Sequence, residues 1–289
     1  MTLIDCITAQ AARLDQAGVF FGHGTNNAFD EAAWLVLWRL GLPLDALDPH
    51  AQRELSRTEL AEITALVDER ISSRRPAAYL TGEAWLQGVP FTVDERAIVP
   101  RSFIAELIAE ASIDPWLSES TRRVLDLCTG NGSLAVLAAM AWPDVTVDAL
   151  DLSADALAVA QLNIDRHHLG ARIHLLQGDG LAGARAPYDL ILCNPPYVNS
   201  RSMAALPAEY QAEPALALAG GIDGMDFVRQ LLSAALDALS LTGVLVLEIG
   251  NERVHFEAAF PTLEVMWLDT SAGEDQVLLV TRQALEKIS

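Results

Sequence analysis

The sequence predicts an α/β protein, in which a Rossmann-like domain with a seven-stranded sheet follows a small helical domain and a β-hairpin linker. Three observations predict this organisation. Apolar residues recur at helical spacing up to about residue 75, two β-rich segments follow, and from Val124 onward apolar strands alternate with helices. Such alternation is typical of a mostly parallel sheet that is covered on both faces.

The first predicted unit, residues 1–75, is helical. Apolar stripes at 3–7, 32–40 and 60–67 have helical spacing, and we expect about four helices in all. The chain breaks between them are expected at two pairs of residues, Gly41 with Pro43 and Asp48 with Pro49.

The second predicted unit, residues 76–100, is a linker. Its β-rich segments are Tyr79 to Trp85 and Val89 to Val99, and the pair Gln87-Gly88 separates them. Two β-rich segments joined by a short polar turn are typical of a hairpin.

The third predicted unit, residues 101–289, carries the sheet. Its seven expected strands are 124–128, 145–150, 172–176, 190–193, 243–249, 263–268 and 277–281. The main intervening helices are expected at 133–140, 153–167 and 225–239.

Composition limits the partners and the compartment. The 39 acidic residues outnumber the 19 basic ones and give a formal charge of −20, which disfavours DNA and favours a basic protein partner. The sequence has no apolar run long enough for a membrane span, and its N-terminus does not resemble a secretory signal. The cysteines Cys6, Cys128 and Cys193 have no CxxC spacing, so we expect no disulfide framework, no metal and a cytoplasmic protein.

A glycine turn follows the first strand of the predicted sheet. In VLDLCTGNGSLA, an apolar strand precedes Gly130 and Gly132, and an apolar helix follows them. A strand, a glycine turn and a helix in this order form the unit that holds a nucleoside cofactor, because glycine lets the backbone approach the ligand closely. Asp126, at the end of the strand, is expected to bind the ammonium group of the cofactor or its hydrogen-bonded water.

Two further acids follow the next two strands. Asp151 is expected to accept hydrogen bonds from ribose hydroxyls, and Asp179 one from an adenine amino group. Ligands of open α/β sheets bind outside the carboxyl ends of the strands, where all these residues are expected. The expected cofactor-binding residues are Asp126, Thr129, Gly130, Gly132, Asp151, Leu152, Asp179, Gly180 and Asn194. A dinucleotide oxidoreductase would share this geometry. The residues that follow the fourth strand therefore have to distinguish the two classes of enzyme.

The fourth strand leads into the tetrad Asn194-Pro195-Pro196-Tyr197. Two prolines make a stiff loop whose carbonyls are free to accept hydrogen bonds. The Asn194 side chain and the Pro195 carbonyl are expected to accept the N–H groups of a planar amide or amine, while the Tyr197 ring stacks on it. The tetrad therefore predicts methyl transfer to a delocalised nitrogen, with Asn194, Pro195 and Tyr197 as catalytic residues and all four residues binding the substrate.

From about Ala77 to Val280 the chain resembles the HemK-like protein-glutamine methyltransferases. The resemblance rests on RRPAAYLTGEAWLQGVPFTVDERAIVPRSFIAELI, VLDLCTGNGSLA, NPPYV, EPALALAGGIDGMDF and LVLEIG. It implies a class I methyltransferase domain that uses S-adenosyl-L-methionine, a helical N-terminal substrate domain and a hairpin linker. It also implies that Asn194 and Tyr197 hold the glutamine amide.

Within this family, FGHGTNNAFDEAAWLVL and AAYLTGEAWLQGVPFTVDERAIVPRS are similar to the branch that modifies large-subunit ribosomal protein L-three. The alternative substrates are peptide chain release factors and, with less support, the exocyclic amines of nucleic acids. A ribosome-binding factor without catalytic activity is a further alternative, against which the intact tetrad argues. The sequence leaves the oligomeric state open.

Several other residues carry weaker expectations. We expect Cys128 to be a small buried residue without a chemical role, and Trp34 and Trp38 to pack in a core. Arg101, in a Pro-Arg element that resembles the family's, closes over the cofactor, orders the linker or forms a surface ion pair. His23 is assigned to an N-terminal recognition loop.

Overall fold

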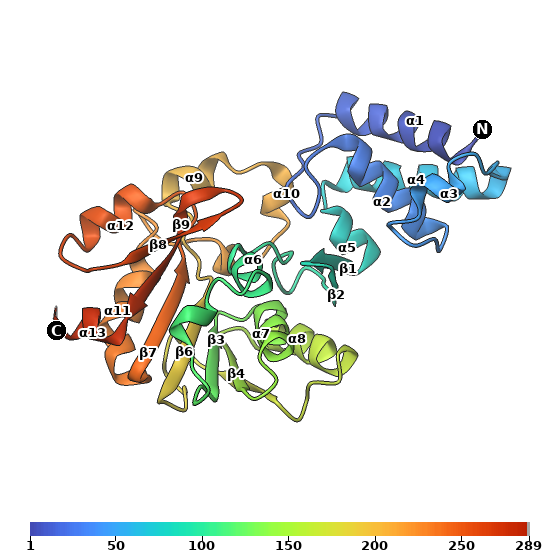
Figure 1. Cartoon of the computed structure of the whole chain (residues 1–289). Coiled ribbons are helices and arrows are strands. Elements are labelled where there is room, and N and C mark those ends of the chain that lie inside the picture. Colours follow the sequence, from blue (N-terminus) through green and yellow to red (C-terminus); the bar gives the residue numbers. More distant parts are fainter. Residues whose placement is uncertain (288–289) are drawn as a thin grey trace.

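The computed structural model describes residues 1–287, so the last two residues of the predicted unit 101–289 lie outside it. A seven-stranded sheet with the order β5-β4-β3-β6-β7-β9-β8 forms the centre of the larger part of the molecule (Figure 1). Strands β3 to β7 are parallel, and β9 runs antiparallel to both β7 and β8. The strands are β3 (Arg123–Leu127), β4 (Thr146–Asp151), β5 (Ile173–Gln177), β6 (Tyr188–Cys193), β7 (Leu239–Glu248), β8 (Met266–Thr270) and β9 (Gly273–Thr281). The predicted fold class is confirmed.

Helices cover both faces of this sheet. On one face are α6 (Ile104–Ala109), α7 (Ser133–Ala141) and α8 (Ala154–Arg166), and on the other are α11 (Asp226–Ala238), α12 (Arg253–Ala259) and α13 (Arg282–Glu286). Successive residues of a strand point to opposite faces, so Val124 packs in one core and Leu125 in the other. The central strands β3, β4 and β6 are therefore buried at nearly every position, as expected for a sheet covered on both sides.

The N-terminal helices pack around a core of their own. They are α1 (Leu3–Gln16), α2 (Ala28–Arg39), α3 (Leu47–His50) and α4 (Arg57–Ser73). Trp34 is buried in this core and Trp38 packs against it, as expected. The expected break at Asp48-Pro49 is wrong, because this pair lies inside the short helix α3. A proline is tolerated there, since the first turn of a helix does not use its N–H groups.

The linker contains less β-structure than the sequence predicts. It consists of α5 (Ala77–Thr81), β1 (Glu83–Leu86) and β2 (Val89–Thr92), and the two strands form the expected hairpin. The segment from Tyr79 is helical because Ala77, Ala78 and Tyr79 are buried against the N-terminal core. Beyond Thr92 the chain leaves the hairpin in a turn.

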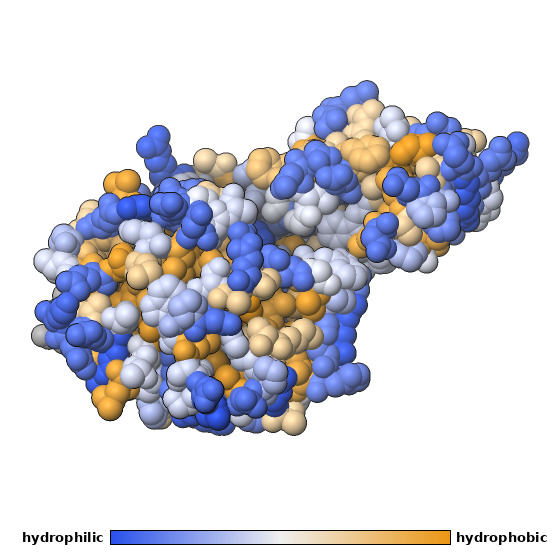
Figure 2. All heavy atoms as spheres, viewed as in Figure 1, coloured by the Kyte–Doolittle hydropathy of each residue, from blue (hydrophilic) through white to orange (hydrophobic). Residues whose placement is uncertain are grey.

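Between β6 and α11, residues 200–219 form what we call the covering segment. It contains α9 (Ser200–Ala205), α10 (Ala208–Gln211) and the 3-10 helix η2 (Ala215–Ala217), and a further 3-10 helix, η1 (Asp114–Trp116), follows α6. The covering segment extends from the sheet to the N-terminal helices (Figure 1). There the buried Glu209 accepts hydrogen bonds from the Phe20 amide, at 3.1 Å, and from Arg70 and Arg74. It therefore ties the covering segment to the N-terminal helices, which form the smaller lobe of the molecule in Figure 2.

Candidate active site

The carboxyl ends of β5, β4, β3 and β6 meet at one edge of the sheet, because these four strands are neighbours and parallel. A cavity of about 300 Å³ lies at this edge, which we call the first cavity. Of the residues predicted to bind the cofactor, those that line it are Gly130, Asp151, Leu152, Asp179, Gly180 and Asn194. The topology thus brings together residues that are far apart in the sequence.

Asp151 is fixed at the wall of the first cavity. Its Oδ2 accepts the Gly130 amide at 2.9 Å and its Oδ1 accepts the Ser153 amide at 2.8 Å. Burial raises the pKa of this carboxyl, and the amide hydrogen bonds oppose the rise. Each carboxylate oxygen can accept a second hydrogen bond, which suits the two hydroxyls of a ribose. Gly130 adds to the fit, because it has a φ of +55° and open space where a Cβ would be.

Apolar side chains complete the first cavity. Leu152 and Leu216 line the cavity and are 47% and 58% exposed, so both are accessible to a ligand. Ile98 and Phe227 also line the cavity. Apolar surface beside the Asp179 carboxylate is suitable for a purine ring with an amino group.

Three of the predicted cofactor residues, Asp126, Thr129 and Gly132, do not line the first cavity. Asp126 is fully buried and accepts hydrogen bonds from the Thr129 hydroxyl and, at 2.9 Å, from the Ala135 amide at the start of α7. Burial raises the pKa of Asp126 to about 7. Gly132 packs on Ala160 of α8, where a Cβ would come within 3.0 Å. These residues therefore support the glycine turn from its buried side.

Cys128 differs from the expectation of a buried residue. It is half-buried, lines the first cavity and has a φ of +61°. A positive φ is the conformation that glycine adopts most easily, so the cysteine occupies a glycine-like position in the turn.

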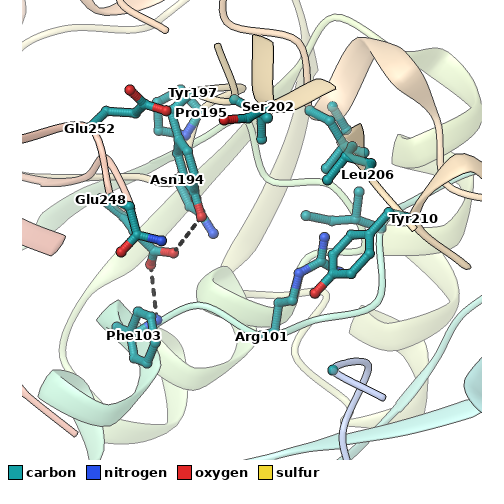
Figure 3. Close-up of a pocket in the computed structure, with 16 residues that line it drawn as sticks. Arg101, Phe103, Asn194, Pro195, Tyr197, Ser202, Leu206, Tyr210, Glu248 and Glu252 are labelled. Atoms are coloured by element: carbon teal, nitrogen blue, oxygen red, sulfur yellow. Dashed lines mark hydrogen bonds between the residues drawn. The ribbon is translucent and has the colours of Figure 1, made fainter. Parts of the chain in front are cut away.

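A second cavity, of about 450 Å³, lies on the other side of the tetrad. Pro195 and Tyr197 line this second cavity and Pro196 lines the first, although the sequence predicts that all four tetrad residues bind the substrate. Asn194 lines both cavities. Figure 3 shows Asn194 and Tyr197 on one side of the second cavity, facing Arg101 and Tyr210. The tetrad is therefore the partition between two ligand-sized spaces.

The Tyr197 ring is held from several sides. Its hydroxyl donates to Glu248 Oε1 at 3.3 Å, and Glu248 Oε2 accepts the Phe103 amide at 2.9 Å (Figure 3). Glu248 Oε2 also accepts the Ser102 hydroxyl at 2.6 Å. Glu248 is buried, which raises the pKa of its carboxyl. Gly250 touches the ring, since a Cβ there would lie 2.5 Å from Tyr197 Cε2. The ring therefore has one orientation, along the wall of the second cavity.

Glu248 is a site residue for which the sequence yielded no expectation. It is the single acid in the apolar strand LVLEIG, whose carboxyl end is beside that of β6. A charged residue at the end of a strand that is otherwise apolar is the signal that points to it. Among residues 1–287, no group of three or more His, Cys, Asp or Glu side chains is arranged to hold a metal ion.

The sheet order, the glycine turn and the paired cavities define a class I methyltransferase fold. The chain matches the family model "Methyltransferase small domain" over residues 109–217 and "PrmC N-terminal domain" over residues 8–82. A relative called ribosomal protein uL3 glutamine methyltransferase, from Bordetella pertussis (strain Tohama I), is 55% identical over 98% of this chain and 96% of its own. One with the same name from Burkholderia pseudomallei (strain K96243) is 50% identical over 100% and 97%. The chain belongs to the family of ribosomal protein uL3 glutamine methyltransferases.

Among solved structures, the chain is similar to the catalytic domain of hMettl16 in complex with the MAT2A 3'UTR hairpin 6. The TM-score is 0.52 at 13% identity, over 78% of this chain and 81% of the other. This similarity extends to the fold alone. Within residues 1–287, no helix combines the length and the apolar character needed to cross a membrane.

The buried Asp126 predicts a pH dependence of stability. The pKa of Asp126 is about 7 in the folded protein and about 3.9 for an aspartate in an unfolded chain, so its contribution to stability is lost as the pH rises from about 4 to about 7. Asp126→Asn carries no charge and should not show this loss. Denaturant unfolding from pH 4 to 8 should show the variant gaining up to about 4 kcal/mol over the wild type across this range. The control Glu119→Gln, at an exposed carboxylate, should match the wild type, and a constant difference for Asp126→Asn would contradict the account.

Gly250→Ala tests the fixed orientation of Tyr197. The new methyl group would displace the ring, so we expect methyl transfer to fall at least about tenfold, while the affinity for S-adenosylmethionine changes less than about threefold. Gly41→Ala is the matched control, because Gly41 also has a positive φ, +63°, but its missing Cβ faces open space. Steady-state kinetics and calorimetric titration measure the two quantities. Normal turnover by Gly250→Ala would show that the ring position is unimportant.

Proposed function

We propose that this protein transfers a methyl group from S-adenosyl-L-methionine to the side-chain amide nitrogen of a glutamine in ribosomal protein uL3, the large-subunit protein L-three. The observation that carries the proposal is the position of Asn194 between the two cavities, each of which has room for one reactant. Relatives with up to 55% identity over nearly the whole chain bear the name of this activity.

The first cavity fits the proposed cofactor. Asp151 would accept the ribose hydroxyls, Asp179 would accept the adenine amino group, and Leu152 and Leu216 would contact the base. Gly130 lets the backbone approach the ligand. When bound, S-adenosylmethionine supplies a methyl group activated by its sulfonium.

The residues of the tetrad orient the glutamine amide nitrogen for attack on the methyl group. An amide nitrogen is a poor nucleophile, because its lone pair is delocalised into the carbonyl. Asn194 Oδ1 and the Pro195 carbonyl each accept one N–H of the glutamine amide, which directs the lone pair toward the first cavity. The Tyr197 ring stacks on the amide plane, and its π face favours positive charge nearby. Transfer of the methyl group would leave S-adenosylhomocysteine and make the amide nitrogen acidic, so that its proton would pass to water without a dedicated base.

We propose that residues 1–75 recognise the protein substrate and that residues 101–289 catalyse the methyl transfer. Residues 76–100 connect these two units. The formal charge of −20 supports a basic protein partner over DNA. A ribosomal substrate implies that the reaction takes place in the cytoplasm, where free cysteines are stable.

The test is methylation of purified, unmethylated uL3 with labelled S-adenosylmethionine, followed by mass spectrometry of the labelled peptide. We expect label on a glutamine side chain. Label on a release factor alone would keep the chemistry but reject the substrate, and label only on RNA or DNA would reject both.

Two variants separate the proposed roles. Asn194→Ala should keep its affinity for S-adenosylmethionine within about threefold of the wild type and lose at least about 100-fold in turnover, because the main effect is the loss of one acceptor of the amide. Asp151→Ala should instead weaken cofactor binding at least about tenfold. Wild-type kinetics in both variants would contradict the assignment of the site.

A further inference from the structure

Arg101 lines the second cavity opposite the tetrad (Figure 3). Its side chain is 24% exposed, and it is absent from the wall of the first cavity. The expectation of a surface ion pair is therefore wrong. The guanidinium belongs to the space that we assign to the protein substrate.

A single carboxylate fixes this guanidinium. Glu213, in the covering segment, accepts Arg101 Nη1 on Oε1 at 2.6 Å and Nη2 on Oε2 at 2.7 Å. Arg101 Nη1 also donates to the Val99 carbonyl at 3.0 Å, and the guanidinium lies 5.2 Å from the centre of the Tyr210 ring. A planar, bidentate pair of this kind sets both the position and the plane of the guanidinium.

Glu213 is itself immobilised. Its side chain is fully buried, it accepts the Val99 amide at 2.9 Å, and His23 of the N-terminal loop lies 3.5 Å from Oε2. Burial alone would raise the pKa of this carboxyl, but His23 and Arg101 outweigh burial and hold the pKa at about 2. The pair therefore stays ionised and balanced in charge, so that Arg101 adds hydrogen-bond donors to the cavity without adding net positive charge.

Two donors of Arg101 remain for a ligand. A guanidinium has five N–H groups, and within residues 1–287 those on Nη1 and one on Nη2 contact Glu213 and Val99. The Nε–H and the second Nη2–H have no acceptor among the described residues. By contrast, Asn194 and Pro195 line the tetrad side of the cavity, where we propose that Asn194 Oδ1 and the Pro195 carbonyl act as acceptors. A polypeptide that enters this cavity needs donors for its own carbonyls, and Arg101 supplies them.

We propose that Arg101 binds main-chain carbonyl oxygens of the substrate polypeptide beside the target glutamine, and that Glu213 is the positioning residue that aims it. The inference rests on the proposed function. The side-chain carbonyl of the glutamine is the wrong acceptor, since a cation on that oxygen would withdraw electron density from the nitrogen that must attack. A main-chain contact instead fixes the backbone on one side while the tetrad holds the amide on the other.

The test uses two variants that keep the buried wall balanced in charge. Arg101→Lys retains a charge for Glu213 but loses the planar fork, and the double variant Arg101→Met with Glu213→Gln removes the ion pair without leaving either charge unpaired. In both variants we expect the KM for uL3 to rise at least about tenfold, as for the loss of one or two hydrogen bonds to a charged donor. The Kd for S-adenosylmethionine and the kcat should change less than about threefold. Arg253→Ala, at an exposed pair with Glu257, is the matched control and should change none of these values.

Two results would overturn the inference. One is an unchanged KM for uL3 in both variants. The other is a Kd for S-adenosylmethionine that rises in parallel with KM, since Pro214, Leu216 and Ala217 line the first cavity and a merely structural role of the pair would disturb both spaces. Turnover of uL3 by the wild type is measured in the same experiment, so a failure of the proposed function appears there and not in the variants.

Discussion

The stiff loop from Asn194 to Tyr197 is the constraint on which the rest of the site depends. It leaves the sheet at the carboxyl end of β6, and its two prolines limit its backbone freedom. The loop is also tied to the end of the covering segment, because Val198 donates to Leu218 at 2.8 Å and accepts from Gly220 at 2.9 Å. A partition that is fixed at both ends can hold two reactants on opposite sides at a constant separation, which is what a direct transfer between them requires.

Buried carboxylates of the covering segment also hold the N-terminal part in a fixed position. Glu209 and Glu213 lie four residues apart in the covering segment. Glu209 binds Arg70 of α4 and Arg74 directly after it, and Glu213 binds Arg101, directly after the linker. Such buried pairs add little net stability, because desolvation offsets most of the attraction, but they are costly to break by removing one partner. Their effect here is geometric. They fix the segment that closes both cavities against the part of the molecule proposed to recognise the substrate.

The local sequence pattern was sufficient to predict which residues lie together at the carboxyl edge of the sheet. A glycine turn and acids that follow apolar strands lie together once the strands are parallel, so Gly130, Asp151 and Asp179 line one cavity. The sequence could not predict features that depend on distant partners. Tyr79 has strand propensity, but burial against the N-terminal core makes its segment helical. The Arg101–Glu213 pair joins residues 112 positions apart, and no periodicity relates them.

The central claim is that the cofactor and the substrate occupy separate cavities that meet at Asn194. The most direct test is a crystal structure of the protein with S-adenosylhomocysteine, the product that remains after methyl transfer. We expect electron density for this product in the first cavity, with the ribose hydroxyls on Asp151 and the sulfur beside Asn194, while the second cavity stays open. Density in the second cavity, or a ribose away from Asp151, would contradict it.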